Sequence, residues 1–143
     1  ARGKIQPLSA FQASSVDALV LPGGFGAAKN LCDWALKGDD CRVHPEVERA
    51  VLDMHRAGKP VGAMCIVPVI LARLLKGIDL TTGKDPASAG FIGRMGNHPV
   101  ESGHGDVVVD PENKIFSTPC YMLDASVSQV AEGAENLVRA MLR

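Results

Sequence analysis

Cys65 has the surroundings that point most directly to chemistry in this 143-residue chain. It lies in KPVGAMCIVPVILARLL, residues 59–75, where a short apolar segment ends and a helical pattern with Pro68 in its first turn begins. A residue at a sharp turn from a buried strand into a helix projects from the sheet edge, where the helix dipole and free N–H groups favour a nucleophilic thiolate. Spacing alone also leaves open, and favours, a buried unreactive thiol.

A glycine-rich turn, LPGGFG at residues 21–26, follows a second apolar segment. Consecutive glycines at Gly23 and Gly24 let backbone N–H groups closely approach a small ligand or a developing oxyanion. The spacing in GGFGAAKN is not that of a dinucleotide-binding fingerprint, and a turn needed only for helix packing is the alternative. Because the carboxyl ends of parallel strands meet at one sheet edge, we expect this turn to lie near Cys65.

A cysteine nucleophile normally requires a base, and the histidines available are His44, His55, His98 and His104. The first two fall at the start and the end of a predicted helix, where we expect structural roles. His98 and His104 fall in an irregular segment that loops could bring to the sheet edge. They are accessory candidates, and exposed loop positions are the alternative.

Cys120, in STPCYML, follows a predicted strand and could approach the same edge as a redox partner of Cys65, although a passive thiol is the more common case. The cysteines lie far apart in the sequence, with no CxxC pair and no tight Cys/His cluster. We therefore expect neither a metal site nor a disulfide framework, and a reducing compartment fits best.

The elements that would position these residues follow the order of an α/β domain with a mostly parallel sheet. Continuous apolar segments predict buried strands at residues 18–21 and 60–64. Helical spacing predicts helices at residues 28–36, 45–58, 66–75 and 124–143. We expect residues 78–100 to form a loop region with one short strand within GIDLTTG, and a β-hairpin to surround the turn at residues 110–113.

Composition limits the classes of partner. Hydrophobic residues make up 46% and charged residues 22% of the chain, which fits one folded domain without long disordered regions. The net charge of −1 and the scattered basic residues give no reason to expect a nucleic acid or an anionic membrane as the partner. The longest apolar stretch is too short to span a bilayer, and the opening residues show no secretory signal. We expect a soluble intracellular protein.

The segments LPGGFGAAKNL, AGKPVGAMCIVPVIL and VVVDPENKIFSTPCYML together resemble the ElbB-like family. These are glyoxalase or isoprenoid-biosynthesis-associated proteins with a class I glutamine amidotransferase-like domain, in a group that includes PfpI-type proteins and deglycases. The resemblance covers nearly the whole chain. It implies one domain over residues 1–143 with a flavodoxin-like three-layer sandwich, in the cytoplasm or in the matrix of a mitochondrion or plastid.

The resemblance also implies a site. Cys65 would stand on a nucleophile elbow, with oxyanion contacts from the backbone of Gly23 and Gly24 and the amide of Ile66. The implied activity is that of a weak glyoxalase on small aldehydes such as glyoxal, through a hemithioacetal, with no metal, glutathione or other cofactor. A homo-oligomer or a subunit of a larger assembly is the expected state.

Departures from the family pattern leave alternatives open. The family's first strand and helix, with the acid that pairs with the cysteine, have no counterpart here, so we expect an N-terminally incomplete domain, about the C-terminal two-thirds. Val67 replaces the glycine of true amidotransferases, and Ile66 replaces the histidine of PfpI-type proteins, so neither glutamine hydrolysis nor peptidase activity is expected. A noncatalytic subunit or fragment and a cysteine redox sensor are the alternative functions.

Overall fold

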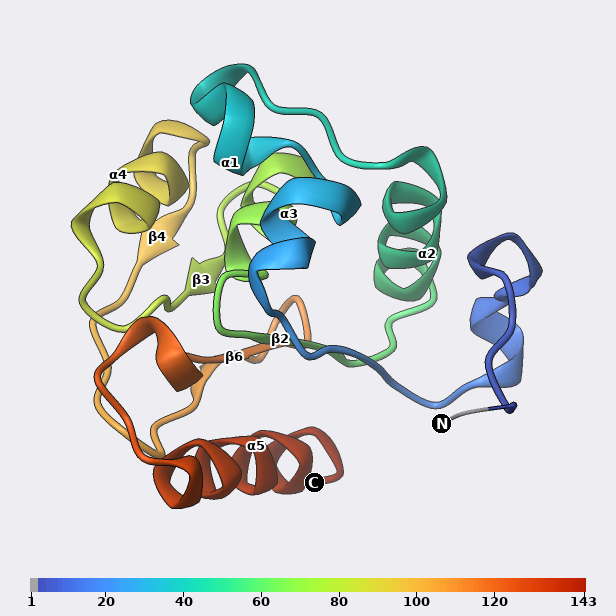
Figure 1. Ribbon diagram of the computed structural model, residues 1–143. Coiled ribbons are helices and arrows are strands. Elements are labelled where there is room, and N and C mark those ends of the chain that lie inside the picture. Colours follow the sequence, from blue (N-terminus) through green and yellow to red (C-terminus); the bar gives the residue numbers. More distant parts are fainter. Residues whose placement is uncertain (1–2) are drawn as a thin grey trace.

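A four-stranded sheet in the order β1-β2-β6-β5 forms the centre of the computed structural model, which describes residues 3–143 (Figure 1). The strands are β1 (Leu19–Leu21), β2 (Val61–Met64), β5 (Val108–Asp110) and β6 (Ile115–Thr118). β2 runs parallel to both of its neighbours, β1 and β6, whereas β5 and β6 form the predicted antiparallel hairpin. The sheet is therefore mostly parallel, as the sequence predicts.

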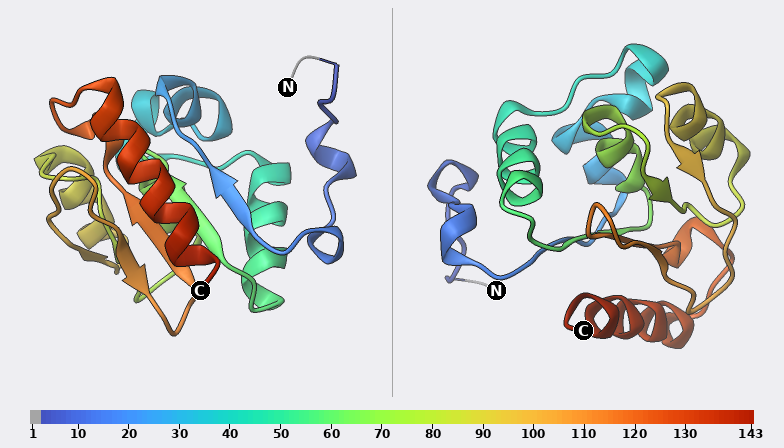
Figure 2. Two further views of the ribbon diagram at one scale, coloured as in Figure 1. Left: turned by 90° about the horizontal axis from the view of Figure 1, so that it is seen from below. Right: turned by 180° about the vertical axis from the view of Figure 1, so that it is seen from behind.

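Helices cover both faces of this sheet. The helix α5 (Val127–Met141) packs on one face, while α2 (Pro45–Arg56) and α3 (Pro68–Leu74) pack on the other (Figures 1 and 2). The start of α5 is fixed by a capping box between Ser126 and Gln129, and α2 and α3 each begin with a proline in the first turn. The three layers confirm the predicted flavodoxin-like α/β architecture.

The predicted helix at residues 28–36 is wrong, because the chain breaks in its middle. A π-helical turn spans Ala27–Leu31, and the four-residue helix α1 (Trp34–Lys37) follows after the break. Cys32 is extended there and forms an isolated antiparallel bridge with Val43, while the Asp33 carboxylate accepts a 2.6 Å hydrogen bond from the backbone N–H of Arg42. These contacts with a distant segment outweigh the local helical pattern.

The predicted loop region at residues 78–100 is also wrong in part. The short strand expected there is β3 (Asp79–Leu80), which pairs in parallel with β4 (His98–Pro99), but the helix α4 (Pro86–Arg94) lies between them. Asp85 caps α4 by accepting a hydrogen bond from the Ser88 N–H, and the helix buries Phe91 and Ile92. Its small residues and glycines give only a weak amphipathic pattern, which is why the sequence does not reveal it.

Asn97, almost fully buried between α4 and β4, holds this part of the fold to α3. Its amide oxygen accepts a 3.1 Å hydrogen bond from the Ile78 N–H. Its amide nitrogen donates to the carbonyls of Ala72 and Leu75, at 3.0 and 3.1 Å. One side chain thus satisfies three backbone groups that would otherwise be buried without partners.

Asp110 joins the hairpin turn to β3. Its carboxylate accepts hydrogen bonds from the backbone and side chain of Asn113, at 3.0 to 3.1 Å, and from the Asp79 N–H at 3.1 Å. Burial pushes the pKa of Asp110 upward, but these hydrogen bonds, together with one from the Glu112 backbone, outweigh that effect. The pKa of Asp110 is therefore lower than its ordinary value.

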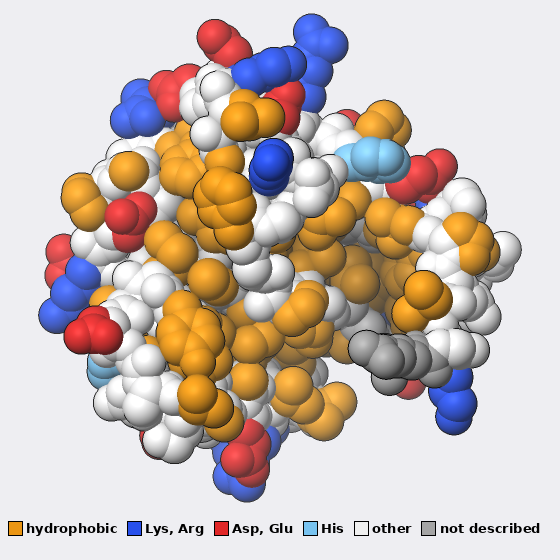
Figure 3. Space-filling view, in the orientation of Figure 1, with side chains coloured by type: hydrophobic (Ala, Val, Ile, Leu, Met, Phe, Trp, Pro, Cys, Tyr) orange, Lys and Arg blue, Asp and Glu red, His pale blue; other side chains and the backbone are white. Residues whose placement is uncertain are grey.

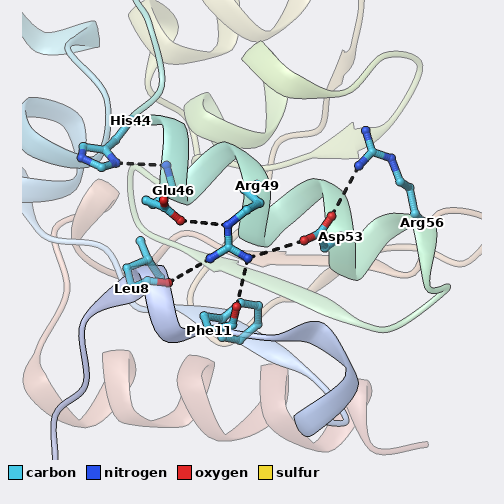
Figure 4. A network of polar contacts seen from close by, with 7 residues as sticks. All are labelled: Leu8, Phe11, His44, Glu46, Arg49, Asp53 and Arg56. Carbon is cyan, nitrogen blue, oxygen red and sulfur yellow. Dashed lines mark hydrogen bonds and ion pairs between the residues drawn. The ribbon is translucent and has the colours of Figure 1, made fainter.

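Arg49 of α2 anchors the N-terminal segment (Figure 4). Its guanidinium donates to the carbonyls of Leu8 and Phe11, at 3.1 and 2.9 Å. Arg56, by contrast, contacts Asp53 within the same helix.

An apolar hollow lies between the N-terminal segment, β1 and α2, and Figure 3 shows it from the side seen in Figure 1. The cavity there has a volume of about 180 Å³. None of the helices within residues 3–143 combines the length and hydrophobicity that crossing a bilayer requires.

Candidate functional site

Cys65 lies on a sharp turn directly after β2. Its φ of 60° places it in the left-handed region, a conformation that costs a non-glycine residue about 1–2 kcal/mol. The turn is fixed by a 3.0 Å hydrogen bond from the Cys65 N–H to the Thr118 carbonyl and by one of 3.1 Å from Val67 to Met64. The sequence predicts a helix that starts directly after Cys65. In the structure α3 begins only at Pro68, so two residues separate the cysteine from the helix.

The glycine turn packs against this elbow. Gly23 and Gly24 both have positive φ, of 92° and 89°. A Cβ atom at Gly23 would lie 2.7 Å from the Met64 carbonyl oxygen and 2.8 Å from the Cys65 Cβ, whereas a Cβ at Gly24 would meet nothing within 4 Å. Only glycine at position 23 therefore permits the observed approach to Cys65. Gly24 faces open space beside it.

A cavity of about 380 Å³ opens beside Cys65. Its lining consists of the thiol-bearing elbow, the glycine turn and mainly apolar side chains: Gly24, Phe25, Ala28, Trp34, Ala35, Cys65, Ile66, Asp85, Ala87 and Met122. Among the described residues, no acceptor is found for the backbone N–H groups of Gly24 and Ile66. Three of the four residues predicted to form the central site, Cys65, Gly24 and Ile66, thus line one cavity, and Gly23 packs directly behind it.

Asp85 is the acid on the cavity wall, and sequence reasoning missed it. It is half-buried, and its carboxylate accepts hydrogen bonds from the N–H and the hydroxyl of Ser88, at 2.8 and 2.5 Å. The pattern Asp-Pro-x-Ser is a helix-start signal that could have located it. Trp34 and Met122, which form apolar walls, were missed because their approach to Cys65 depends on long-range packing.

The structure does not bring the histidines to this cavity. His98 is exposed in β4, with its Nδ1 2.9 Å from an Asp79 carboxylate oxygen. His104 is exposed in the turn before β5. His44 caps α2, where its Nδ1 accepts a hydrogen bond from Glu46, and His55 lies near the end of that helix. The two helix-associated histidines have the structural positions that the sequence predicts.

Cys120 follows β6 after one proline and also has a positive φ, of 47°. It is 7% exposed, and its pKa is raised by burial and by the neighbouring Cys65 thiol, while a hydrogen bond with the Cys65 backbone partly offsets this rise.

Burial also raises the pKa of the two other cysteines, Cys32 and Cys41. All four thiols are free. Within residues 3–143, no group of three or more His, Cys, Asp or Glu side chains has a metal-binding arrangement.

Comparisons with known proteins identify the fold. The chain is 39% identical, over 99% of its length, to human glutamine amidotransferase-like class 1 domain-containing protein 3, mitochondrial, and spans 56% of that relative. The crystal structure of an isoprenoid biosynthesis protein with an amidotransferase-like domain from Ehrlichia chaffeensis is 35% identical, with a TM-score of 0.89 over 99% of this chain and 65% of that one.

Drosophila melanogaster DJ-1beta, at 21% identity and a TM-score of 0.55 over 88% of this chain and 66% of that one, shares the fold alone. No family model matches the chain. The chain spans about six-tenths of the length of the human and Ehrlichia relatives, so a relative's whole activity does not transfer with the match. Together, the parallel sheet, the cysteine elbow and these relatives show that the chain has the fold of the class I glutamine amidotransferase-like, or DJ-1/ThiJ/PfpI, superfamily.

Proposed function

We propose that this chain carries the nucleophile of an ElbB-like, glyoxalase-type enzyme that needs no metal and no glutathione. The observation that carries the proposal is the strained elbow of Cys65 at the wall of an apolar cavity, opposite a glycine turn. Strain of this kind persists where the surrounding structure enforces it, and it concentrates at functional sites. Cys65 is the proposed nucleophile, and the backbone N–H groups of Gly23, Gly24 and Ile66 are the proposed oxyanion donors.

The proposed substrate class is the 2-oxoaldehydes. The Cys65 thiolate adds to the aldehyde carbon, and the carbonyl electron pair moves to oxygen, where the N–H donors stabilise it until protonation gives a hemithioacetal. A base then moves the proton on that carbon to the neighbouring carbonyl carbon through an enediol, which leaves a thioester. Water cleaves the thioester to a 2-hydroxy acid and restores the thiol. No external oxidant or reductant is consumed, because one carbon is oxidised as the other is reduced.

Asp85 is our candidate for the base, because it is the carboxylate on the cavity wall. Asp85→Asn keeps a side-chain oxygen that can cap α4, since Asn and Asp are similarly good caps. This variant should therefore fold normally while its kcat/KM falls by about 10²–10⁴-fold, the usual contribution of a positioned base. Unchanged turnover in Asp85→Asn would assign the base elsewhere.

The cavity indicates which aldehydes fit best. Phe25, Trp34 and Met122 supply apolar walls, and glyoxal has no apolar group to contact them. Burying an aromatic ring contributes about 1.5–3 kcal/mol, so kcat/KM for phenylglyoxal should exceed that for glyoxal by roughly 10- to 100-fold. A preference for glyoxal would contradict this assignment of the cavity.

The test is turnover of phenylglyoxal to mandelate by the purified protein, followed by chromatography. We expect many product molecules per protein, and loss of turnover in Cys65→Ala but not in Cys41→Ala, which removes a thiol buried elsewhere. Full activity in Cys65→Ala would refute the proposal. Consumption of one aldehyde per thiol without mandelate would instead favour the noncatalytic alternative, a structural subunit of a larger assembly.

We also propose a mitochondrial location, which is supported by the name of the human relative. Fractionation of cells of the source organism, with an antibody against this chain, should recover it with matrix markers. Recovery with cytosolic or plastid markers would contradict this part of the proposal.

A further inference from the structure

The carboxyl ends of β2 and β6 bring two cysteines to one point of the sheet edge. The strands are parallel neighbours with Met64 and Thr118 in register, and each strand ends within two residues of a cysteine. The Cys65 N–H donates to the Thr118 carbonyl at 3.0 Å, so the two chain ends remain joined beyond the last strand pair. The backbone is left-handed at both Cys65 and Cys120, which turns each chain sharply at the same edge.

The electrostatic coupling of the two side chains agrees with this backbone geometry. Burial and the charge of the Cys65 thiol both raise the pKa of Cys120. Their exposures differ: Cys65 lines the open cavity, whereas Cys120 is 7% exposed beside it. An oxidant that enters the cavity therefore meets Cys65 first, while Cys120 is shielded from it.

We propose that Cys65 and Cys120 form a reversible peroxide-driven disulfide, with Cys65 as the attacking thiol and Cys120 as the resolving thiol. This function is independent of the proposed aldehyde chemistry. The Cys65 thiolate attacks a hydroperoxide, so that a sulfur–oxygen bond forms, the oxygen–oxygen bond breaks, and water or an alcohol leaves. The Cys120 sulfur then attacks the sulfenic sulfur of Cys65. A sulfur–sulfur bond forms, the sulfur–oxygen bond breaks, and the hydroxide leaves as water with the proton of Cys120.

The arrangement would give the site two properties. The disulfide occupies the sulfur that faces the cavity, so oxidation blocks access of a ligand to Cys65. It also protects Cys65 from the irreversible sulfinic acid, because the resolving thiol consumes the sulfenic acid before a second peroxide does. A thiol reductant such as dithiothreitol restores both cysteines.

The test uses the reduced wild-type protein, hydrogen peroxide as the probe, and peptide mapping by mass spectrometry with a count of free thiols. We expect the loss of two thiols per chain, a peptide pair joined through Cys65 and Cys120, and full recovery with dithiothreitol. Wild-type protein that gains two oxygens on Cys65 while Cys120 stays free would overturn the proposal, as would a disulfide between chains through Cys65. These outcomes need neither turnover nor a folded variant, so they separate this proposal from the aldehyde reaction.

Two variants make the assignment specific. In Cys120→Ala, peroxide should remove one thiol instead of two and should leave Cys65 as sulfinic acid that dithiothreitol does not reverse. Cys41→Ala, which removes a fully buried thiol, should behave as wild type. Equal sensitivity of Cys65 to sulfinic acid formation in the wild type and in Cys120→Ala would refute a resolving role for Cys120.

Discussion

Replacing Gly23 by alanine tests the contact between the glycine turn and the elbow. Gly23 and Gly24 have nearly equal φ values, of 92° and 89°, so alanine at either position incurs a similar conformational cost of about 1–3 kcal/mol. Only at position 23 would the new Cβ also lie 2.7 Å from the Met64 carbonyl oxygen and 2.8 Å from the Cys65 Cβ. These atoms belong to the backbone or are fixed to it, so they cannot rotate away, and overpacking of this kind costs about 1–3 kcal/mol more.

Gly24→Ala is therefore the matched control. Urea denaturation of the two variants and the wild type should show that Gly23→Ala lowers the free energy of unfolding by about 1–3 kcal/mol more than Gly24→Ala does, with similar m-values. Losses that agree within about 0.5 kcal/mol would refute the reasoning, because the turn would then not touch the elbow as described.

Three further substitutions test the fold around the site. Arg49→Ala should raise amide exchange in residues 8–11 about tenfold, because the carbonyls of Leu8 and Phe11 lose their partner. Arg56→Ala should leave this exchange unchanged, and equal effects of the two variants would contradict the anchoring. Asn97→Ala should lower the free energy of unfolding by about 2–4 kcal/mol, because three buried backbone groups lose their hydrogen-bond partner. A loss under about 1 kcal/mol in urea denaturation would contradict this role of Asn97. Asp110 has a lowered folded pKa, so its stabilisation is complete above its unfolded pKa of about 3.9 and is lost as pH falls through the folded value. Asp110→Asn should accordingly flatten the fall of stability below about pH 4, and an unchanged slope in acid denaturation curves would contradict the assignment.

The elements that depend on local pattern could be predicted from the sequence. The strands β1 and β2 are continuous apolar segments, and the hairpin has turn residues between two β-rich segments. The glycine turn and Cys65 could be placed near one another because parallel strands present their carboxyl ends at one edge. The position of Pro68 in the first turn of α3 also followed from the fixed φ of proline.

The rest depends on contacts between distant segments. The helix is interrupted at Cys32 by a bridge to Val43, and the local sequence of residues 28–36 contains no signal for this interruption. Asp85 reaches the cavity only because α4 packs against α3, and the glycines of α4 hide its helical pattern in the sequence. The residues that line the cavity come from segments that follow four different strands, β1, β2, β3 and β6, so their meeting at Cys65 is a property of the packed fold.

Site-resolved alkylation of the native protein tests the central claim most directly, that Cys65 is the reactive thiol of a ligand-binding cavity. Limiting iodoacetamide, with mass-spectrometric readout of the four cysteines over time, should label Cys65 first, since Cys32, Cys41 and Cys120 are buried with raised pKa values. Phenylglyoxal added beforehand should slow labelling of Cys65. Labelling of Cys65 no faster than that of Cys120, or unaffected by the aldehyde, would contradict the account.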